Sequence, residues 1–177
     1  MFLSALTFTG LSIIAKTHAA ENFDTGPLIK DFGSSVSVEQ TYPVSSQQTF
    51  KVVFDFSELT DPQIVHGNIN SAARFLNMHV RAGVEAKNIQ LALVVHGDAS
   101  NSLLKDERYQ AKYQRNNPNK KLLEALLKHQ VRVILCGQTA AYHKITSDDL
   151  VEGAEIALSA MTANALLQQQ GYTLNPF

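Results

Sequence analysis

Two short and almost continuously apolar runs restrict the fold more than any other feature of the sequence. They are "NIQLALVVHG" at 88–97 and "VRVILC" at 131–136, and an earlier run, "TFKVVFDFS" at 49–57, is rich in β-branched and aromatic residues. Strands that are apolar on both faces are typical of parallel sheets covered by other layers on both sides. Between the runs, the spacing of apolar residues changes to that of a helix. The sequence therefore predicts an α/β domain.

The segments between and after these runs predict the helices. Start signals are a cap residue followed by proline, or a pair of acidic residues, and the stop signals are glycines. A short terminal strand is expected in "YTLNPF" at 172–177. In chain order, the expected helices run from Pro62 to the stop at Gly83, over 101–115, from Pro118 through 130, and from the capping pair Asp149 and Glu152 to the stop at Gly171.

The alternation of strands and helices predicts one three-layer domain over 49–177. Right-handed crossovers would arrange a mostly parallel sheet of four to five strands with helices on both faces. The chain has 177 residues, of which 45% are hydrophobic, so it can form a substantial core. Residues 21–48 are irregular in composition and are expected to be either draped over the domain or partly mobile. A net charge of -1 argues against nucleic acid or an anionic membrane surface as partner.

The N-terminal residues 1–20 have the pattern of a signal peptide. An apolar run from Phe2 to Ala15 is followed by small residues, and it is too short to span a bilayer comfortably. No positive charge precedes the run, so a buried helix is the alternative. Export would place the protein in the periplasm after cleavage following Ala19 or Ala20, without a stable membrane span. A single cysteine there has no internal disulfide partner.

That cysteine, Cys136, ends an apolar run and is followed by Gly137. Sites in parallel sheets lie outside the carboxyl ends of strands, where His96 and Gly97 also fall, so Cys136 and His96 are expected to share a cleft. A short helix after Gly137 would direct the amides of Gln138, Thr139 and their neighbours at the sulfur, favouring a thiolate. The alternative is a packed strand-end residue, because free cysteine is often buried.

Motifs for other chemistries are missing from the sequence. It has neither a G-x-G-x-x-G nor a P-loop glycine pattern, no G-x-S-x-G and no H-E-x-x-H. We therefore expect no organic cofactor and no metal, although a zinc site from His96, Cys136 and His143 is geometrically conceivable. The residues expected to carry the site are Cys136 and His96, with Gly97, Gly137, Gln138 and Thr139 as substrate-binding residues.

Three segments, "LALVVHGDASNSLL", "VRVILCGQTAAYHKI" and "SAMTANALLQQQGYTLNPF", resemble the DsrE/DsrF-like (YchN-like) family over residues 50–177. The resemblance implies compact α/β units that assemble as trimers or hexamers. It also implies that Cys136 accepts sulfane sulfur as a persulfide and exchanges it with a donor or acceptor protein. The competing hypothesis is a non-catalytic oligomeric protein that binds a small ligand, with Cys136 incidental.

Overall fold

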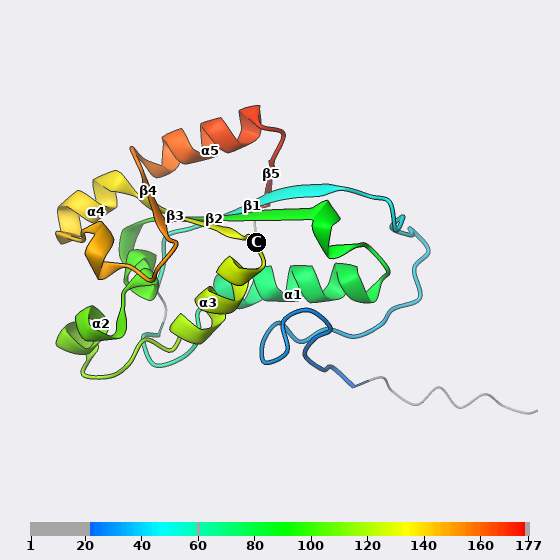
Figure 1. The fold of residues 1–177 in the computed structure, drawn as a ribbon, viewed down its shortest axis with the longest axis horizontal. Helices are drawn as coiled ribbons and strands as arrows, with labels where there is room; N and C mark the ends of the chain where they lie inside the picture. The colour runs from blue at the N-terminus through cyan, green and yellow to red at the C-terminus, as the bar shows by residue number, and fades with distance from the viewer. Residues whose placement is uncertain (1–21, 60, 176–177) are drawn as a thin grey trace, which may run out of the picture.

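The computed structural model describes residues 22–59 and 61–175, which contain one sheet of five parallel strands (Figure 1). The strand order is β4-β3-β2-β1-β5. The expected α/β class and parallel sheet are thereby confirmed. In chain order the strands are β1 (Phe50–Phe56), β2 (Ile89–Val95), β3 (Arg132–Cys136), β4 (Glu155–Ala157) and β5 (Thr173–Asn175).

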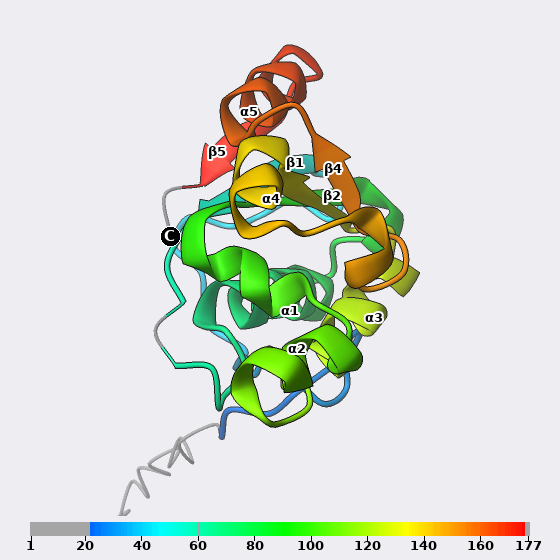
Figure 2. The ribbon, with the colours of Figure 1, turned by 90° about the vertical axis from the view of Figure 1, so that its left-hand side faces the viewer.

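Helices cover both faces of this sheet. Figure 1 shows α5 on one face and α1 and α3 on the other, while Figure 2 shows α4 and α2 in front of the carboxyl ends of the central strands. Short 3-10 helices span Ala86–Asn88, Gly97–Leu103 and Ser147–Asp149. The α-helices are α1 (Gly67–Arg81), α2 (Asp106–Tyr113), α3 (Lys120–Lys128), α4 (Gly137–His143) and α5 (Ala160–Gln169).

The sheet separates two apolar cores of unequal size. The larger lies on the α1 and α3 side, where long side chains such as Leu76, Leu91 and Leu123 are buried. The smaller lies beneath α5, whose buried positions include the short Ala160 and Ala163. Small side chains at these positions permit a close approach of α5 to the sheet. The buried members of the smaller core are Val53, Ala92, Val94, Ile134, Cys136, Ala160, Ala163 and Leu167.

The first helix begins later than its sequence predicts. It starts at Gly67 rather than Pro62, because tertiary contacts hold the preceding residues in a loop. The carbonyl of Pro62 accepts a hydrogen bond of 2.7 Å from the Tyr109 hydroxyl. His66 then caps the helix, since its Nδ1 accepts from the amide of Asn68 at 3.1 Å. A local proline signal was overridden by contacts with α2 and by a histidine cap.

The last predicted helix is also wrong at its start. Instead of a helix from 152, the chain forms β4 and begins α5 at Ala160, where the Ser159 side chain accepts from an amide. Asp149 forms a capping box with Thr146, not with Glu152. Gly153 adopts φ +91°, which interrupts a helix, and the backbone beyond it pairs with β3. Pairing along the sheet edge therefore prevails over helical propensity.

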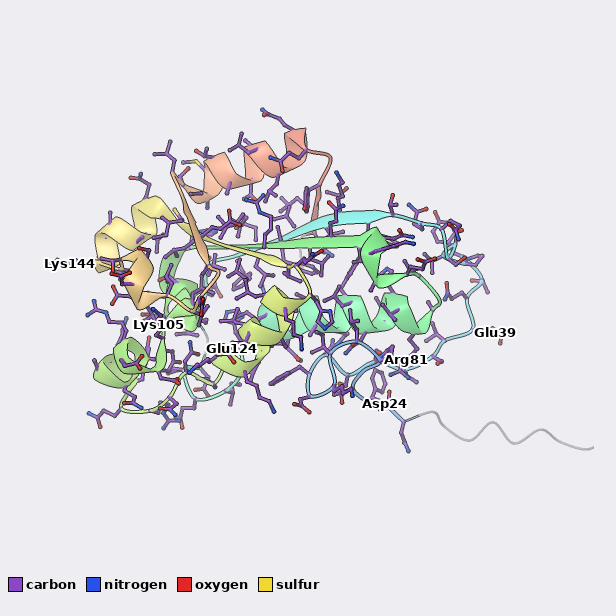
Figure 3. All side chains as sticks on the ribbon, in the orientation of Figure 1. Asp24, Glu39, Arg81, Lys105, Glu124 and Lys144 are labelled. Atoms are coloured by element: carbon purple, nitrogen blue, oxygen red, sulfur yellow. The ribbon has the colours of Figure 1, made fainter. Side chains whose placement is uncertain are left out.

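The first part of residues 22–48 lies along α1 on the side away from the sheet, and the rest runs past the end of α1 to β1 (Figure 1). Asp24 and Ser35 form an isolated antiparallel bridge, and Arg81 of α1 contacts Asp24 (Figure 3). The buried Asn77 side chain bonds to the backbone of this segment. The predicted signal peptide lies outside the described residues. Within 22–59 and 61–175, no helix has both the length and the apolar character needed to cross a bilayer.

Candidate functional site

Cys136 is both the last residue of β3 and the residue that precedes the first turn of α4. Its side chain belongs to the smaller core beneath α5, and only 7% of the residue is exposed. The strand-end position predicted from the sequence is thus combined with the burial expected of a packed cysteine. The polar environment of the sulfur distinguishes a reactive thiol from a cysteine that serves only for packing.

Polar hydrogens converge on the Cys136 thiol. Burial acts to raise the pKa of the thiol, but the nearby amides of Thr139, Ala160 and Gln138 and the hydroxyl of Thr139 act to lower it. Together they outweigh burial and hold the pKa below its ordinary value. Two of these amides are in the first turn of α4 and one is the first residue of α5, so two helix starts meet at one sulfur. Such groups stabilise an anion, which here is the thiolate.

Gly137 is required by the close approach of α4 to β4. A Cβ atom at this position would overlap the carbonyl oxygen of Ala157 and would lie 3.0 Å from that of Leu158. The next residue, Gln138, donates from Nε2 to the Leu158 carbonyl at 3.1 Å. Gly137 and Gln138 therefore connect the start of α4 to the backbone at the end of β4.

His96 directly follows β2, which pairs in parallel with β3. Their register aligns Val95 with Leu135, so the next residue of each strand is His96 on one and Cys136 on the other. The imidazole Nε2 of His96 lies 3.1 Å from Oδ1 of Asp55 on β1. Strand register thus places a histidine–carboxylate pair beside the strand that carries the thiol.

Asp55 is a site residue that the sequence reasoning missed. Its Oδ2 accepts a hydrogen bond of 3.0 Å from Nδ2 of Asn164 on α5. Apart from the His96 contact, its Oδ1 is buried without a hydrogen-bond partner among the residues that the structure describes. The available signal was a carboxylate within the strand-like run at 49–57, two positions after the apolar Val53 and so on the same face of the strand.

An open cleft of about 460 Å³ lies in front of the strand ends. The predicted binding residues Gly97, Gln138 and Thr139 line it, whereas Gly137 does not. Cys136 and His96, which were expected to share a cleft, are not among its lining residues either. The amide of Gly97 donates to the Thr139 hydroxyl at 3.1 Å, and that hydroxyl also contacts the thiol. Thr139 therefore connects the buried sulfur to the open cleft. The complete lining is Gly97, Asp98, Gln138, Thr139, Tyr142 and His143.

The zinc alternative is not supported by the arrangement of its candidate ligands. His143 is the last residue of α4, at the opposite end of that helix from Cys136. In the parts of the chain that the structure describes, no group of three or more His, Cys, Asp and Glu side chains could hold a metal ion.

The model of the DsrE/DsrF-like family matches residues 64–176, which confirms the resemblance predicted from the sequence. Protein MTH1491 of unknown function from Methanobacterium thermoautotrophicum shares this fold, with a TM-score of 0.55 and 21% identity over 71% of this chain and 97% of its own. The ychN protein of E. coli is 21% identical over 73% of this chain and 100% of its own, with a TM-score of 0.49. No curated protein sequence matches the chain significantly.

Proposed function

Because the chain belongs to the DsrE/DsrF-like family, we propose that it handles sulfur, with Cys136 as a transient carrier of a sulfane sulfur atom. The Cys136 thiolate attacks the outer sulfur of a donor such as thiosulfate or a polysulfide. A new S–S bond forms, the donor's S–S bond breaks, and sulfite or a shorter polysulfide leaves with the bonding electron pair. An acceptor thiolate then attacks the outer sulfur of the persulfide and releases Cys136 as thiolate, so no external oxidant is consumed.

The observation that carries this proposal is the set of amides and the hydroxyl that surround the sulfur. They favour the thiolate, which is the nucleophilic form, although the residue is buried. The same groups are suited to the negative outer sulfur of a persulfide. Donor access is through the cleft, because Thr139 belongs to both the cleft lining and the thiol environment.

His96 and Asp55 have a supporting role in this proposal. Asp55 lies 3.1 Å from the His96 imidazole and holds it at the end of the strand that pairs with the strand of Cys136. Asn164 in turn fixes the Asp55 carboxylate from α5.

The test is the intact mass of the protein after exposure to thiosulfate or polysulfide. We expect an increase of one sulfur atom that a thiol reductant removes, and we expect Cys136→Ser to show no increase. His96→Ala is a variant of the same site that keeps the thiol, and it should form the persulfide more slowly. An unchanged mass of the wild-type protein, or the same increase in Cys136→Ser, would overturn the proposal.

One observation favours a second function, a small-ligand-binding protein in which Cys136 is incidental. The residue is only 7% exposed, whereas the adjoining cleft of about 460 Å³ is open. In that case ligand binding would be unaffected by Cys136→Ser and no persulfide would form. The mass measurement therefore separates the two functions.

Self-association as a trimer or hexamer is part of the proposal. Large apolar side chains that are exposed in one chain lie on α4, on α5, on both edge strands β4 and β5, and in the turn between β4 and α5. Clusters of this kind commonly mark protein interfaces. The exposed apolar side chains in question are Tyr142, Ile156, Leu158, Met161, Leu166 and Leu174.

Export to the periplasm is also part of the proposal, and it rests on the N-terminal apolar run alone.

A further inference from the structure

A second cavity lies between α2 and the end of α4, on the far side of His143 from the strand-end cleft. Figure 2 shows these two helices one above the other in front of the sheet. The cavity measures about 280 Å³ and is here called the α2–α4 pocket. His143 lines both this pocket and the strand-end cleft, so the two hollows are adjacent.

The floor of the α2–α4 pocket is apolar and rigid. Leu104 is 2% exposed and forms an isolated bridge with Leu150, while Ile145 is 7% exposed. The amide of Ile145 bonds to the carbonyl of Ala140 at 2.8 Å, which fixes it to α4. Ala111 of α2 completes the apolar lining. Such a surface can accept the apolar body of a small ligand.

Lys112 supplies a positive charge at the rim. Its Nζ donates to Oδ1 of Asn101 at 2.9 Å, and Asn101 is 2% exposed and anchored through Nδ2 to the carbonyl of Asp98. A buried neutral amide thus holds the ammonium in place without neutralising it. Among the described residues, no carboxylate lies within ion-pair distance of Lys112.

Arg108 supplies the second charge, one helical turn before Lys112 and on the same face of α2. Its Nε is 3.8 Å from Oδ1 of Asp149, and its Nη2 is 3.4 Å from the carbonyl of Lys144. Both contacts are long, and the other Asp149 oxygen already accepts from Thr146 at 2.8 and 2.9 Å. The guanidinium therefore keeps donors for a ligand, because its one carboxylate contact, to Asp149, is 3.8 Å long.

We propose that the α2–α4 pocket binds a small organic carboxylate. The carboxylate would accept charge-assisted hydrogen bonds from Arg108 and Lys112, while the apolar part of the ligand would lie on Leu104, Ala111 and Ile145. Arginine provides the planar pair of donors that matches a carboxylate, and lysine adds a point charge. This binding does not depend on the reaction proposed for Cys136.

The experiment compares three probes with the full chain by titration followed in amide NMR spectra. Benzoate has both the charge and the apolar body, benzamide lacks the charge, and acetate lacks the apolar body. We expect benzoate to saturate and to shift the amides of Ala111 and Ile145, with benzamide and acetate each at least about ten-fold weaker.

Variants identify the charges responsible. Arg108→Gln and Lys112→Gln should each weaken benzoate about ten-fold, whereas Arg108→Lys should retain more affinity than Arg108→Gln. Lys128→Gln, on the exposed surface of α3 and outside the pocket, is the matched control and should bind as the wild type does. Cys136→Ser should also bind benzoate normally, which separates this site from the persulfide reaction.

Three results would overturn the proposal. These are equal binding of benzamide and benzoate, unchanged benzoate affinity in both glutamine variants, or shifts that map away from α2 and α4. Thermal unfolding of each variant shows whether it is folded. If a glutamine variant is unfolded, Arg108→Lys against wild type supplies the comparison, and equal or tighter benzoate binding by Arg108→Lys counts against the proposal.

Discussion

Replacement of Asn77 by alanine should release the N-terminal segment from α1. Asn77 is fully buried, and its Oδ1 accepts from the amides of Leu28 and Ile29 at 3.1 and 2.7 Å. Its Nδ2 donates to the carbonyls of Ile29, Phe32 and Gly33 at 2.9, 2.9 and 3.0 Å. One side chain thus satisfies backbone groups across a whole loop.

The free energy that Asn77 contributes is calculated from the number of hydrogens that it can donate, and not from the number of its contacts. An amide nitrogen has two hydrogens, so its three contacts amount to two full donations, and the oxygen accepts two more. At about 1 kcal/mol of net stabilisation for each bond, the side chain contributes about 4 kcal/mol to docking of the segment. Because the segment can undock while the sheet stays folded, the loss should appear as local opening more than as global unfolding.

Hydrogen exchange at the amides of Leu28 and Ile29 measures the local opening of the segment directly. A loss of about 4 kcal/mol predicts exchange about 1000-fold faster in Asn77→Ala, since 1.4 kcal/mol corresponds to ten-fold. Amides of the central strand β2 should change far less. Limited proteolysis should also cut the segment sooner.

Asn70→Ala is the matched control, on the same helix and facing the same segment. Its Oδ1 accepts one hydrogen bond, from the amide of Gly33 at 2.8 Å. Loss of one bond of about 1 kcal/mol predicts exchange only about five-fold faster. If Asn77→Ala and Asn70→Ala accelerate exchange equally, or if neither does, the reasoning from hydrogen-bond count is refuted.

Four further outcomes are expected. The rate of Cys136 alkylation by iodoacetamide should reach half its maximum at a pH below that of a free-cysteine peptide, because the lowered thiol pKa keeps the thiolate at lower pH; a thiol that reacts only in unfolded protein would contradict this. Gly137→Ala should cost about 1–3 kcal/mol of stability in thermal unfolding, because its Cβ overlaps the backbone after β4, and unchanged stability would contradict the close approach. Light scattering should find a trimer or larger that Leu158→Asp, at a residue 71% exposed in one chain, dissociates; a wild-type monomer would rule assembly out. Mass spectrometry of the protein from its native host should find a mature chain that starts at Ala20 or Glu21, and an intact cytoplasmic chain from Met1 would rule export out.

The sequence alone determined the sheet and its central elements. Each of β1, β2 and β3 is long enough for its apolar pattern to indicate a strand, and the leucines of α3 follow helical spacing. Position at the carboxyl end of a strand follows directly from the chain, so Cys136 and His96 were identifiable as strand-end residues. Local patterns suffice wherever a single element carries the information.

Only the tertiary structure decided the conformation of the segment that leads from β3 to α5. The three residues of β4 are too few to show a period of two, and they form a strand because β3 offers an edge to pair with. That pairing moves the start of α5 to Ala160, whose amide then faces the thiol. A sequence pattern describes one element at a time and does not report which partner completes it.

The polar partners of the site were decided in the same way. The contact between Asp55 and His96 depends on the register of β1 and β2, and the α2–α4 pocket joins Arg108 and Lys112 to Ile145, more than thirty positions later. Such contacts carry no local signature, because their energy arises only after distant segments have been brought together by the hydrophobic core. The sequence therefore indicated which strand ends carry the candidate residues, and packing determined which groups surround them.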